Sequence, residues 1–317
     1  MKEEKDTSSK KTILGDTAKH LSNCCLNTFY FCAGIVFLLL AKIKHIVLGY
    51  SPKPFTTSEI ERCILYDVHV VNDWLERLMG YAPDLSIRDK HILELGPGSD
   101  LGVGLYLLSK SAKKYTAVDV YDLASSLSPN FYNAFFTYLR EKEQTETAQL
   151  EAELQKTQHR QNDRLNYVCR PDFDLSEAID GDMVDVIFSN AAFEHFNDID
   201  QTIEKISGLA ASGAVFIVSV DLRTHSRWIR DKDPNNIYRY PAWLYRLLST
   251  RSTPNRNRPR QYQVALTQNG WKDIVIQPEM RLDNKRFTSF QPYLNKRYRD
   301  ASNQMDYLTV WICAKRT

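Results

Sequence analysis

One short run, HILELGPGSDLG over residues 91–102, limits the folds open to this chain more than any other stretch. An apolar segment carries an acid at Glu94 and breaks directly into a turn that contains Gly96 and Gly98. Glycine adopts positive φ and has no Cβ, so the backbone of such a turn can approach a bound ligand closely. A second apolar segment follows and ends at Asp119. The order strand, glycine turn, helix, strand and acid predicts a nucleoside-binding βαβ unit.

The glycine spacing separates the candidate nucleosides. A dinucleotide fold favours G-x-G-x-x-G, but the third glycine here is Gly102, one residue late. Glu94 precedes the turn, where an acid favours a cationic ligand over a pyrophosphate. With these motifs the chain resembles the class I S-adenosylmethionine-dependent methyltransferases. The resemblance implies that S-adenosylmethionine is the cofactor, that Gly96 and Gly98 approach it, and that Asp119 binds its ribose hydroxyls.

Further apolar segments supply the rest of an α/β sheet. The run over 184–189 is nearly continuous, as in a central strand buried on both faces, and a helix with apolar spacings of three and four follows it. Other strands are predicted over 165–169, 213–220, 272–277 and 307–314. The resemblance implies a Rossmann-like sheet of seven strands with an antiparallel C-terminal strand, in one methyltransferase domain over 59–317.

The resemblance also implies cofactor contacts after the third and fourth strands. In the family an acid after the third strand accepts the adenine amino group while the neighbouring backbone reads the ring edge. Asp172 and Phe173 match that pattern, with Asp174 as a competing acid. Asn190 ends the fourth strand and completes the predicted pocket.

Composition narrows the class of protein. The 41 basic side chains nearly balance the 39 acidic ones, so net charge does not point to nucleic acid. The six cysteines form no C-x-x-C pair and have no histidine at metal-ligand spacing. A reduced, metal-free intracellular protein is the expectation.

One stretch, residues 139–164, is rich in Glu, Gln, Lys and Ala and has little apolar periodicity. It predicts a solvated helical arm inserted between the second and third strands. A partner-binding or dimerising arm is the alternative.

The first 58 residues form a separate segment with an apolar helix. Residues 21–41 carry no charge, but the strongly apolar part over 29–41 is too short to span a bilayer alone. Cations then alternate with apolar residues up to 48, which suits a helix lying at a membrane surface. Membrane association through 21–48, spanning or interfacial, and a helix docked on the domain are the two interpretations. Because S-adenosylmethionine is a cytosolic metabolite, the domain is expected in the cytoplasm, at the inner face of the membrane where one is bound.

Methyl transfer needs aligned reactants and, for a hydroxyl nucleophile, a base. His195 follows the fourth strand by a few residues and is a candidate base, with a structural or cofactor-facing histidine as the alternative. Asp221 and His225 follow the fifth strand, where ligands of open α/β sheets bind. They are expected to deprotonate the acceptor or to hold a lid closed.

The acceptor is suggested by residues 222–260, which hold nine arginines interleaved with aromatic residues and prolines. Guanidinium groups bind phosphate or carboxylate and aromatic rings stack on sugars, so the stretch predicts a cap over an anionic small molecule, glycan or lipid-linked acceptor. A solvated basic loop cluster is the alternative. The Asp-Leu-Arg-x-His segment and this Arg-rich stretch also resemble methyltransferases of bacterial surface polysaccharides.

Two other functions stay open beside this one. A nucleic-acid methyltransferase would also use arginine and aromatic side chains, although no nucleic-acid module is recognisable. A catalytically silent, membrane-tethered protein that binds S-adenosylmethionine as a scaffold is the other alternative. The intact acids and glycines of the cofactor motifs argue against such a decayed pocket.

Overall fold

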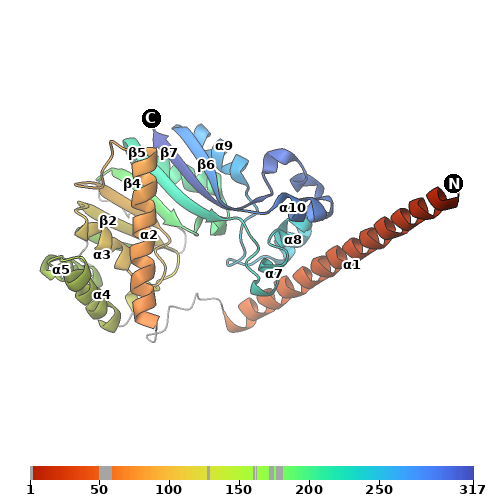
Figure 1. Ribbon diagram of the computed structural model, residues 1–317. Helices are drawn as coiled ribbons and strands as arrows, with labels where there is room; N and C mark the ends of the chain where they lie inside the picture. The colour runs from red at the N-terminus through yellow and green to blue at the C-terminus, as the bar shows by residue number, and fades with distance from the viewer. Residues whose placement is uncertain are drawn as a thin grey trace. The chain divides into compact units, whose positions relative to one another are not determined.

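The computed structural model describes residues 3–49, 59–126, 129–159, 161, 163–170, 175 and 181–317, with side-chain surroundings from residue 23 onward. The chain forms two compact units (Figure 1). The sheet unit comprises Ser51–Asp221, Pro259–Pro278 and Val310–Thr317. The helical unit comprises Met1–Tyr50, Leu222–Arg258 and Glu279–Thr309.

The sheet has seven strands in the order β3-β2-β1-β4-β5-β7-β6. Neighbouring strands from β3 to β5 pair in parallel, and the C-terminal strands are antiparallel. The predicted Rossmann-like seven-stranded sheet with an antiparallel C-terminal strand is therefore confirmed. The strands are β1 (His91–Leu95), β2 (Lys114–Asp119), β3 (Leu165–Cys169), β4 (Val184–Asn190), β5 (Ala210–Asp221), β6 (Trp271–Arg281) and β7 (Tyr307–Arg316).

Helices cover both faces of this sheet because the central strands are apolar on both sides. On one face Trp74 of α2 (Ile60–Tyr81) stacks on Phe188 of β4, with ring centroids 4.6 Å apart. On the other face Phe216 of β5 meets Phe193 at 5.3 Å and Trp271 at 5.6 Å. The first face carries α2 (Ile60–Tyr81), α3 (Gly102–Ser109), α4 (Pro129–Lys142) and α5 (Ala148–Gln158), and the second carries α6 (Ile199–Leu209) and α9 (Pro259–Gln268). Short 3₁₀ turns are η2 (Ala124–Ser126) and η3 (Phe193–His195).

The helix-forming stretch over 139–164 is not a single solvated arm, and that prediction is corrected. Its first residues end α4, Gln144 takes a positive φ of 51° in the connection, and α5 begins at Ala148. Leu150 and Leu154 are buried in the main core with Leu139. This packing could not be predicted from the sequence, because only two leucines of α5, four residues apart, enter the core.

The helical unit is built around a cluster of tyrosine, leucine and phenylalanine side chains. Its elements are α1 (Glu3–Leu48), α7 (Arg227–Arg230), η4 (Asn236–Arg239), α8 (Ala242–Leu248), α10 (Asn284–Phe290), η5 (Gln291–Tyr293), η6 (Lys296–Tyr298) and η7 (Ala301–Asn303). The apolar N-terminal helix is present and continues well before residue 21. Most of the Arg-rich stretch, residues 222–258, folds with α1 and with residues 279–309.

Candidate functional site

The candidate site lies in the sheet unit, at the carboxyl ends of its parallel strands. β1, β2, β4 and β5 pair in parallel, so their last residues meet at one edge of the sheet. That edge brings together Glu94, Asp119, Asn190 and Asp221 with the glycine turn after β1. Ligands of open α/β sheets bind at this edge.

The glycine turn has the backbone that the sequence predicts. Gly96 and Gly98 have φ of 76° and 80°. The Gly96 amide donates a 2.9 Å hydrogen bond to the carbonyl of Val118, and a Cβ on Gly96 would overlap the Cβ of Ala192. A Cβ on Gly98 would meet nothing within 4 Å. Gly98 therefore presents bare backbone on an open side, where a ligand can approach it.

Asp119 stands beside this turn at the end of β2. Its carboxylate accepts a 3.0 Å hydrogen bond from the amide of Tyr121 and a further bond from the amide of Gly98. Burial raises the pKa of Asp119, and the backbone hydrogen bonds oppose that rise. The side chain is only half-buried, so its carboxylate keeps acceptor positions for the hydroxyl groups of a ligand.

Glu94 lies below the turn and is 3% exposed. The hydroxyl of Tyr115 on β2 donates a hydrogen bond to its carboxylate. Burial raises the pKa of Glu94 to about 8, and the hydrogen bond from Tyr115 opposes that rise. A cation beside this group would favour its ionised form and lower that pKa.

Two further acids belong to this region, and sequence reasoning missed both. Asp67 of α2 and Asp100 of the turn are buried and hydrogen-bonded to each other. Burial raises the pKa of each, so the pair shares a proton. The Asp100 carboxylate also accepts a 2.9 Å hydrogen bond from the amide of Gly102, at the start of α3. A Cβ on Gly102 would overlap the Asp67 carboxyl, which gives the late third glycine a packing reason.

An acid inside the glycine run was the available signal for Asp100. Asp67 gave none, because a single acid on an amphipathic helix is ordinary. Another contact from α2 was equally unpredictable: the Asn190 amide donates a 3.0 Å hydrogen bond to the hydroxyl of Tyr66.

His195 and Asp221 lie at the same edge of the sheet unit. Burial lowers the pKa of His195, and the charge of Asp221 partly opposes this. The imidazole is therefore neutral at pH 7 and able to accept a proton. His225 belongs to the helical unit, where the neighbouring amide of Thr224 donates a 2.7 Å hydrogen bond to the carbonyl of Pro234. The adenine-site candidates Asp172, Phe173 and Asp174 lie outside the described residues.

Three arginines of the predicted cap have internal roles in the helical unit. Arg239 forms a buried ion pair with Asp233, with the two atoms 2.7 Å apart. Arg256 and Arg258 donate hydrogen bonds to backbone carbonyl groups, at 2.7 Å to Tyr240 and 2.9 Å to Tyr307. These three side chains hold the unit together, so the case for an anionic acceptor depends on the other arginines of 222–260.

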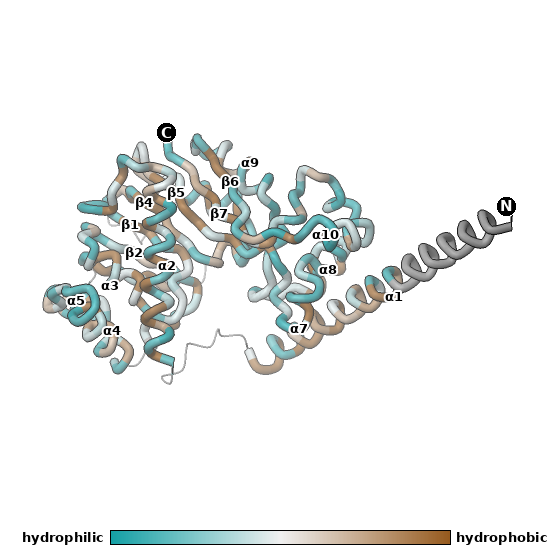
Figure 2. Tube along the Cα trace, in the orientation of Figure 1, coloured by the Kyte–Doolittle hydropathy of each residue, from teal (hydrophilic) through white to brown (hydrophobic). Residues whose placement is uncertain are grey.

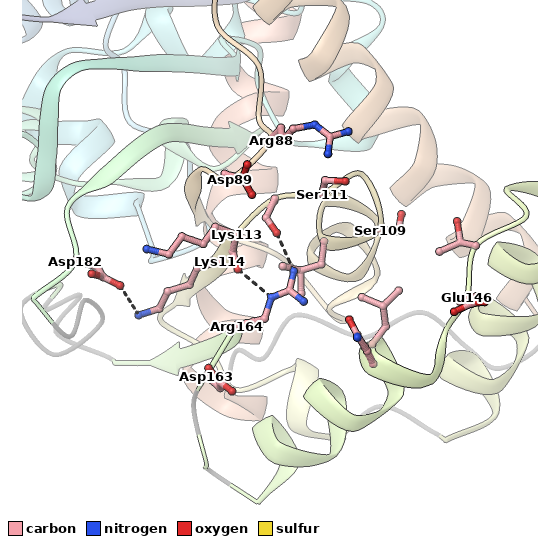
Figure 3. A pocket seen from close by; sticks show the side chains of 15 residues that line it. Arg88, Asp89, Ser109, Ser111, Lys113, Lys114, Glu146, Asp163, Arg164 and Asp182 are labelled. Atoms are coloured by element: carbon pink, nitrogen blue, oxygen red, sulfur yellow. Dashed lines mark hydrogen bonds and ion pairs between the residues drawn. The ribbon is translucent and has the colours of Figure 1, made fainter.

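A hollow of about 740 Å³ lies elsewhere in the sheet unit (Figure 3). It borders the amino ends of β1 and β2, opposite the glycine turn. Lys114 pairs with Asp182 across 3.8 Å, and Arg164 donates hydrogen bonds of 3.0 Å to the carbonyls of Ala112 and Lys113. Lys114 and Arg164 are thus engaged with the protein, and the hollow is separate from the candidate site.

Comparison with known proteins identifies the family to which this geometry corresponds. A family model described as a methyltransferase domain matches residues 66–275. No curated protein matches the sequence.

Several solved methyltransferase structures are similar in fold. The CurJ carbon methyltransferase is 16% identical, with 94% of this chain and 71% of that chain covered and a TM-score of 0.46. Geranyl diphosphate C-methyltransferase from Streptomyces coelicolor is 15% identical, with 84% and 86% covered and a TM-score of 0.43. Phosphoethanolamine N-methyltransferase 2 from Haemonchus contortus is 15% identical, with 77% and 52% covered and a TM-score of 0.41. At these values the similarities say nothing about the acceptor.

Proposed function

The chain belongs to the class I S-adenosylmethionine-dependent methyltransferases, and on that premise we propose that it methylates a small-molecule, glycan or lipid-linked acceptor whose attacking atom carries a proton. It is an enzyme that methylates, and S-adenosylmethionine is its cofactor. The observation that carries the proposal is the shared edge of the sheet. The glycine turn and Asp119, which suit a nucleoside, lie at the same strand ends as His195 and Asp221, which suit proton transfer.

The residues of this edge fit the cofactor. The open side of Gly98 admits close backbone contact, and the half-buried Asp119 offers acceptors to ribose hydroxyls. Asn190 lies beside them at the end of β4, and Glu94 offers a carboxyl that a cation would ionise. When bound, S-adenosylmethionine supplies a methyl group on a positively charged sulfur. In this proposal Asp172 and Phe173 bind the adenine ring.

His195 is the proposed base. Its imidazole is neutral at pH 7 because burial lowers its pKa, so it can take the proton of a hydroxyl or amine as the new bond to carbon forms. Asp221 stabilises the resulting imidazolium by charge, as its effect on the pKa of His195 indicates. His225 is the proposed acceptor-side contact from the segment that follows β5.

The proposed acceptor is anionic and is a free small molecule, a glycan or a lipid-linked group. The exposed arginines of 222–260, which are Arg227, Arg246, Arg251 and Arg260, support an anion, since guanidinium groups pair with phosphate and carboxylate in two-pronged geometry. The cytoplasm is the proposed location, because the cofactor is cytosolic.

The test is methyl transfer from tritiated S-adenosylmethionine into separated lipid, glycan, RNA and protein pools, with cofactor binding followed by thermal shift. Bound cofactor raises the melting temperature by mass action. Asp119→Ala is expected to abolish most of the shift, and His225→Ala to keep the shift and lower turnover. A matched control is Asp122→Ala, because Asp122 is exposed and follows β2 by three residues.

The outcomes separate the alternatives. A thermal shift without transfer to any pool would favour the silent scaffold. Label confined to RNA would replace the acceptor by a nucleic acid. Full turnover in His225→Ala would remove that residue from the acceptor side.

A further inference from the structure

Helix α1 has two distinct faces within the helical unit. The inner face is buried or half-buried and recurs every three or four residues, at Asn27, Phe31, Gly34 and Leu38. Phe31 packs on Tyr240 with ring centroids 5.2 Å apart. This spacing is the signature of a helix packed along one side of a folded unit.

The contact at Gly34 is close and specific. A Cβ on Gly34 would overlap both the hydroxyl of Tyr240 and the amide oxygen of Asn236. That hydroxyl donates hydrogen bonds of 2.5 Å to Asn236 and 3.2 Å to the carbonyl of Phe31, and the Asn236 amide donates one of 2.9 Å to the carbonyl of Tyr30. The α1 backbone is therefore fixed against η4.

A buried ion pair extends this attachment. Arg239 and Asp233 are each only 2% exposed and lie 2.7 Å apart. Arg239 also donates a 2.8 Å hydrogen bond to the amide oxygen of Asn27 on α1. Hydrogen bonds to the remaining groups of a buried pair offset the cost of burying its charges, and Asn27 supplies one of those partners.

The outer face of α1 is apolar and exposed. Figure 2 shows many hydrophobic residues along the coloured part of α1, which ends at Leu48. The part of α1 over Asn23–Leu48 is long and apolar enough to cross a membrane. Only 17% of the most apolar window within it is buried. The exposed apolar side chains are Leu26, Phe29, Val36, Leu39, Leu40, Ile43, Ile46, Val47 and Leu48.

Exposed aromatic side chains of the same unit adjoin this outer face. Trp228 is 80% exposed and stacks on Phe37 of α1, with ring centroids 6.4 Å apart. Trp243 is 67% exposed on α8, one helical turn before the exposed Leu247. The ammonium of Lys42 on α1 bonds the carbonyl of Leu247, so α8 runs beside the helix. Tryptophan is the residue most typical of membrane–water interfaces.

Positive charges predominate around the outer face, and Asp231 is an exposed acid near Trp228 in sequence. Residues 23–48 contain lysines and no acid, and Lys44 is exposed. Exposed arginines flank the two tryptophans in sequence at Arg227 and Arg246. Of the two acids in 222–258, Asp233 is neutralised by its buried ion pair. An apolar strip with cations around it complements an anionic lipid surface.

We propose that the outer face of α1, with Trp228 and Trp243 beside it, docks this protein in the plane of an anionic phospholipid surface. The docking is independent of the proposed methyl transfer. Of the two forms of membrane association considered from the sequence, spanning and interfacial, this proposal takes the interfacial one. A helix that crossed the bilayer would take η4, α8 and the Arg239–Asp233 pair into the hydrocarbon with it, where irregular backbone exposed to lipid does not occur.

The experiment uses the full-length protein and vesicle flotation. Vesicles of phosphatidylcholine with phosphatidylglycerol are compared with phosphatidylcholine alone, at low and high salt. Flotation is expected on the anionic vesicles and is expected to weaken with salt. The double variant Ile46→Ser/Val47→Ser, at side chains 71% exposed, should weaken partitioning about tenfold or more without unfolding the chain. Lys44→Gln should weaken it roughly fivefold, on anionic vesicles only.

Met79→Ser is the matched control, because Met79 is 66% exposed on the sheet unit and should leave flotation unchanged. Alkaline carbonate washing should release the docked protein from membranes, and retention would mean that α1 spans. Light scattering without vesicles gives the other contrary result. The parent protein would then fail to float and would be a dimer, and the Ile46→Ser/Val47→Ser variant would be a monomer. That result would assign the outer face to a second copy of the chain. Either result overturns the proposal and leaves methyl transfer untouched.

Discussion

Gly104 packs against Tyr115, whose hydroxyl is hydrogen-bonded to Glu94 in the candidate site. Replacement of Gly104 tests whether this packing matters. A Cβ on Gly104 would lie closer than 3.0 Å to three ring atoms of Tyr115. That ring is fully buried, and its hydroxyl is hydrogen-bonded to Glu94, so it has no free space to enter. Gly104→Ala therefore overpacks the core, which costs about 1–3 kcal/mol. Alanine in a helix gains at most about 1 kcal/mol over glycine in return.

The matched control is Gly208→Ala. Gly208 is also helical, but a Cβ there would meet nothing within 4 Å. The helical gain is common to both substitutions, so their difference isolates the packing term. We expect Gly104→Ala to be less stable than Gly208→Ala by about 1–3 kcal/mol, measured as the free energy of unfolding in urea at equal slope. Equal stability of the two variants would refute the claim that Tyr115 is held rigidly.

The same pair of variants has a functional readout. Displacement of Tyr115 moves the donor that holds the Glu94 carboxyl, so Gly104→Ala should also weaken S-adenosylmethionine binding in calorimetry. Gly208→Ala should bind as the parent protein does. Loss of stability with unchanged cofactor affinity would separate Tyr115 from the site.

Three further predictions concern the pH dependence of stability, catalysis, and the packing of α1 on the helical unit. Because the pKa of Glu94 is raised from an ordinary value of 4.5 to about 8, the unfolded chain binds fewer protons between these values, and the unliganded protein should lose stability as pH rises through that window. The Glu94→Gln variant should lose less stability over the same pH range. An equal change in the urea midpoint between pH 5 and pH 8 for the two proteins would contradict this. Since burial lowers the pKa of His195, turnover should persist below pH 6.5, and His195→Gln should lose turnover while binding cofactor in a thermal-shift assay. Gly34→Ala should speed amide hydrogen exchange across residues 27–38, whereas Ala41→Val at an exposed position should not; equal protection would show that the helix tolerates a side chain there.

The sheet could be predicted from sequence because its signals are local and repeated. The apolar run of β4, with Phe188 buried on one face and Ile187 on the other, identifies a central strand without knowledge of its neighbours. The glycine turn was equally readable, since positive φ at Gly96 and Gly98 follows from the residue type. These features depend on backbone conformation and on which side of a strand is covered.

The support beneath the site could not be predicted, because it depends on partners far apart in sequence. Asp67 meets Asp100 across α2 and the glycine turn, and Tyr115 reaches Glu94 from the next strand. The roles of the arginines in residues 222–260 could not be predicted for the same reason. Composition cannot distinguish Arg258, which holds backbone carbonyls inside the helical unit, from an arginine that faces a ligand.

The buried acids explain why the glycine spacing departs from the dinucleotide pattern. Asp100 occupies a place within the glycine run and bonds the amide of Gly102, so its carboxylate already satisfies a donor that a phosphate would otherwise receive at the start of α3. Asp67 and Glu94 add two more carboxyls beside it, and burial raises the pKa of all three. As ionised carboxylates these groups would repel an anion, and burial instead favours their protonated forms. A cationic ligand stabilises the ionised carboxylates, because opposite charges attract. The late Gly102 and the acids around it are therefore parts of one arrangement, as expected under our proposal that this edge of the sheet binds a positively charged nucleoside.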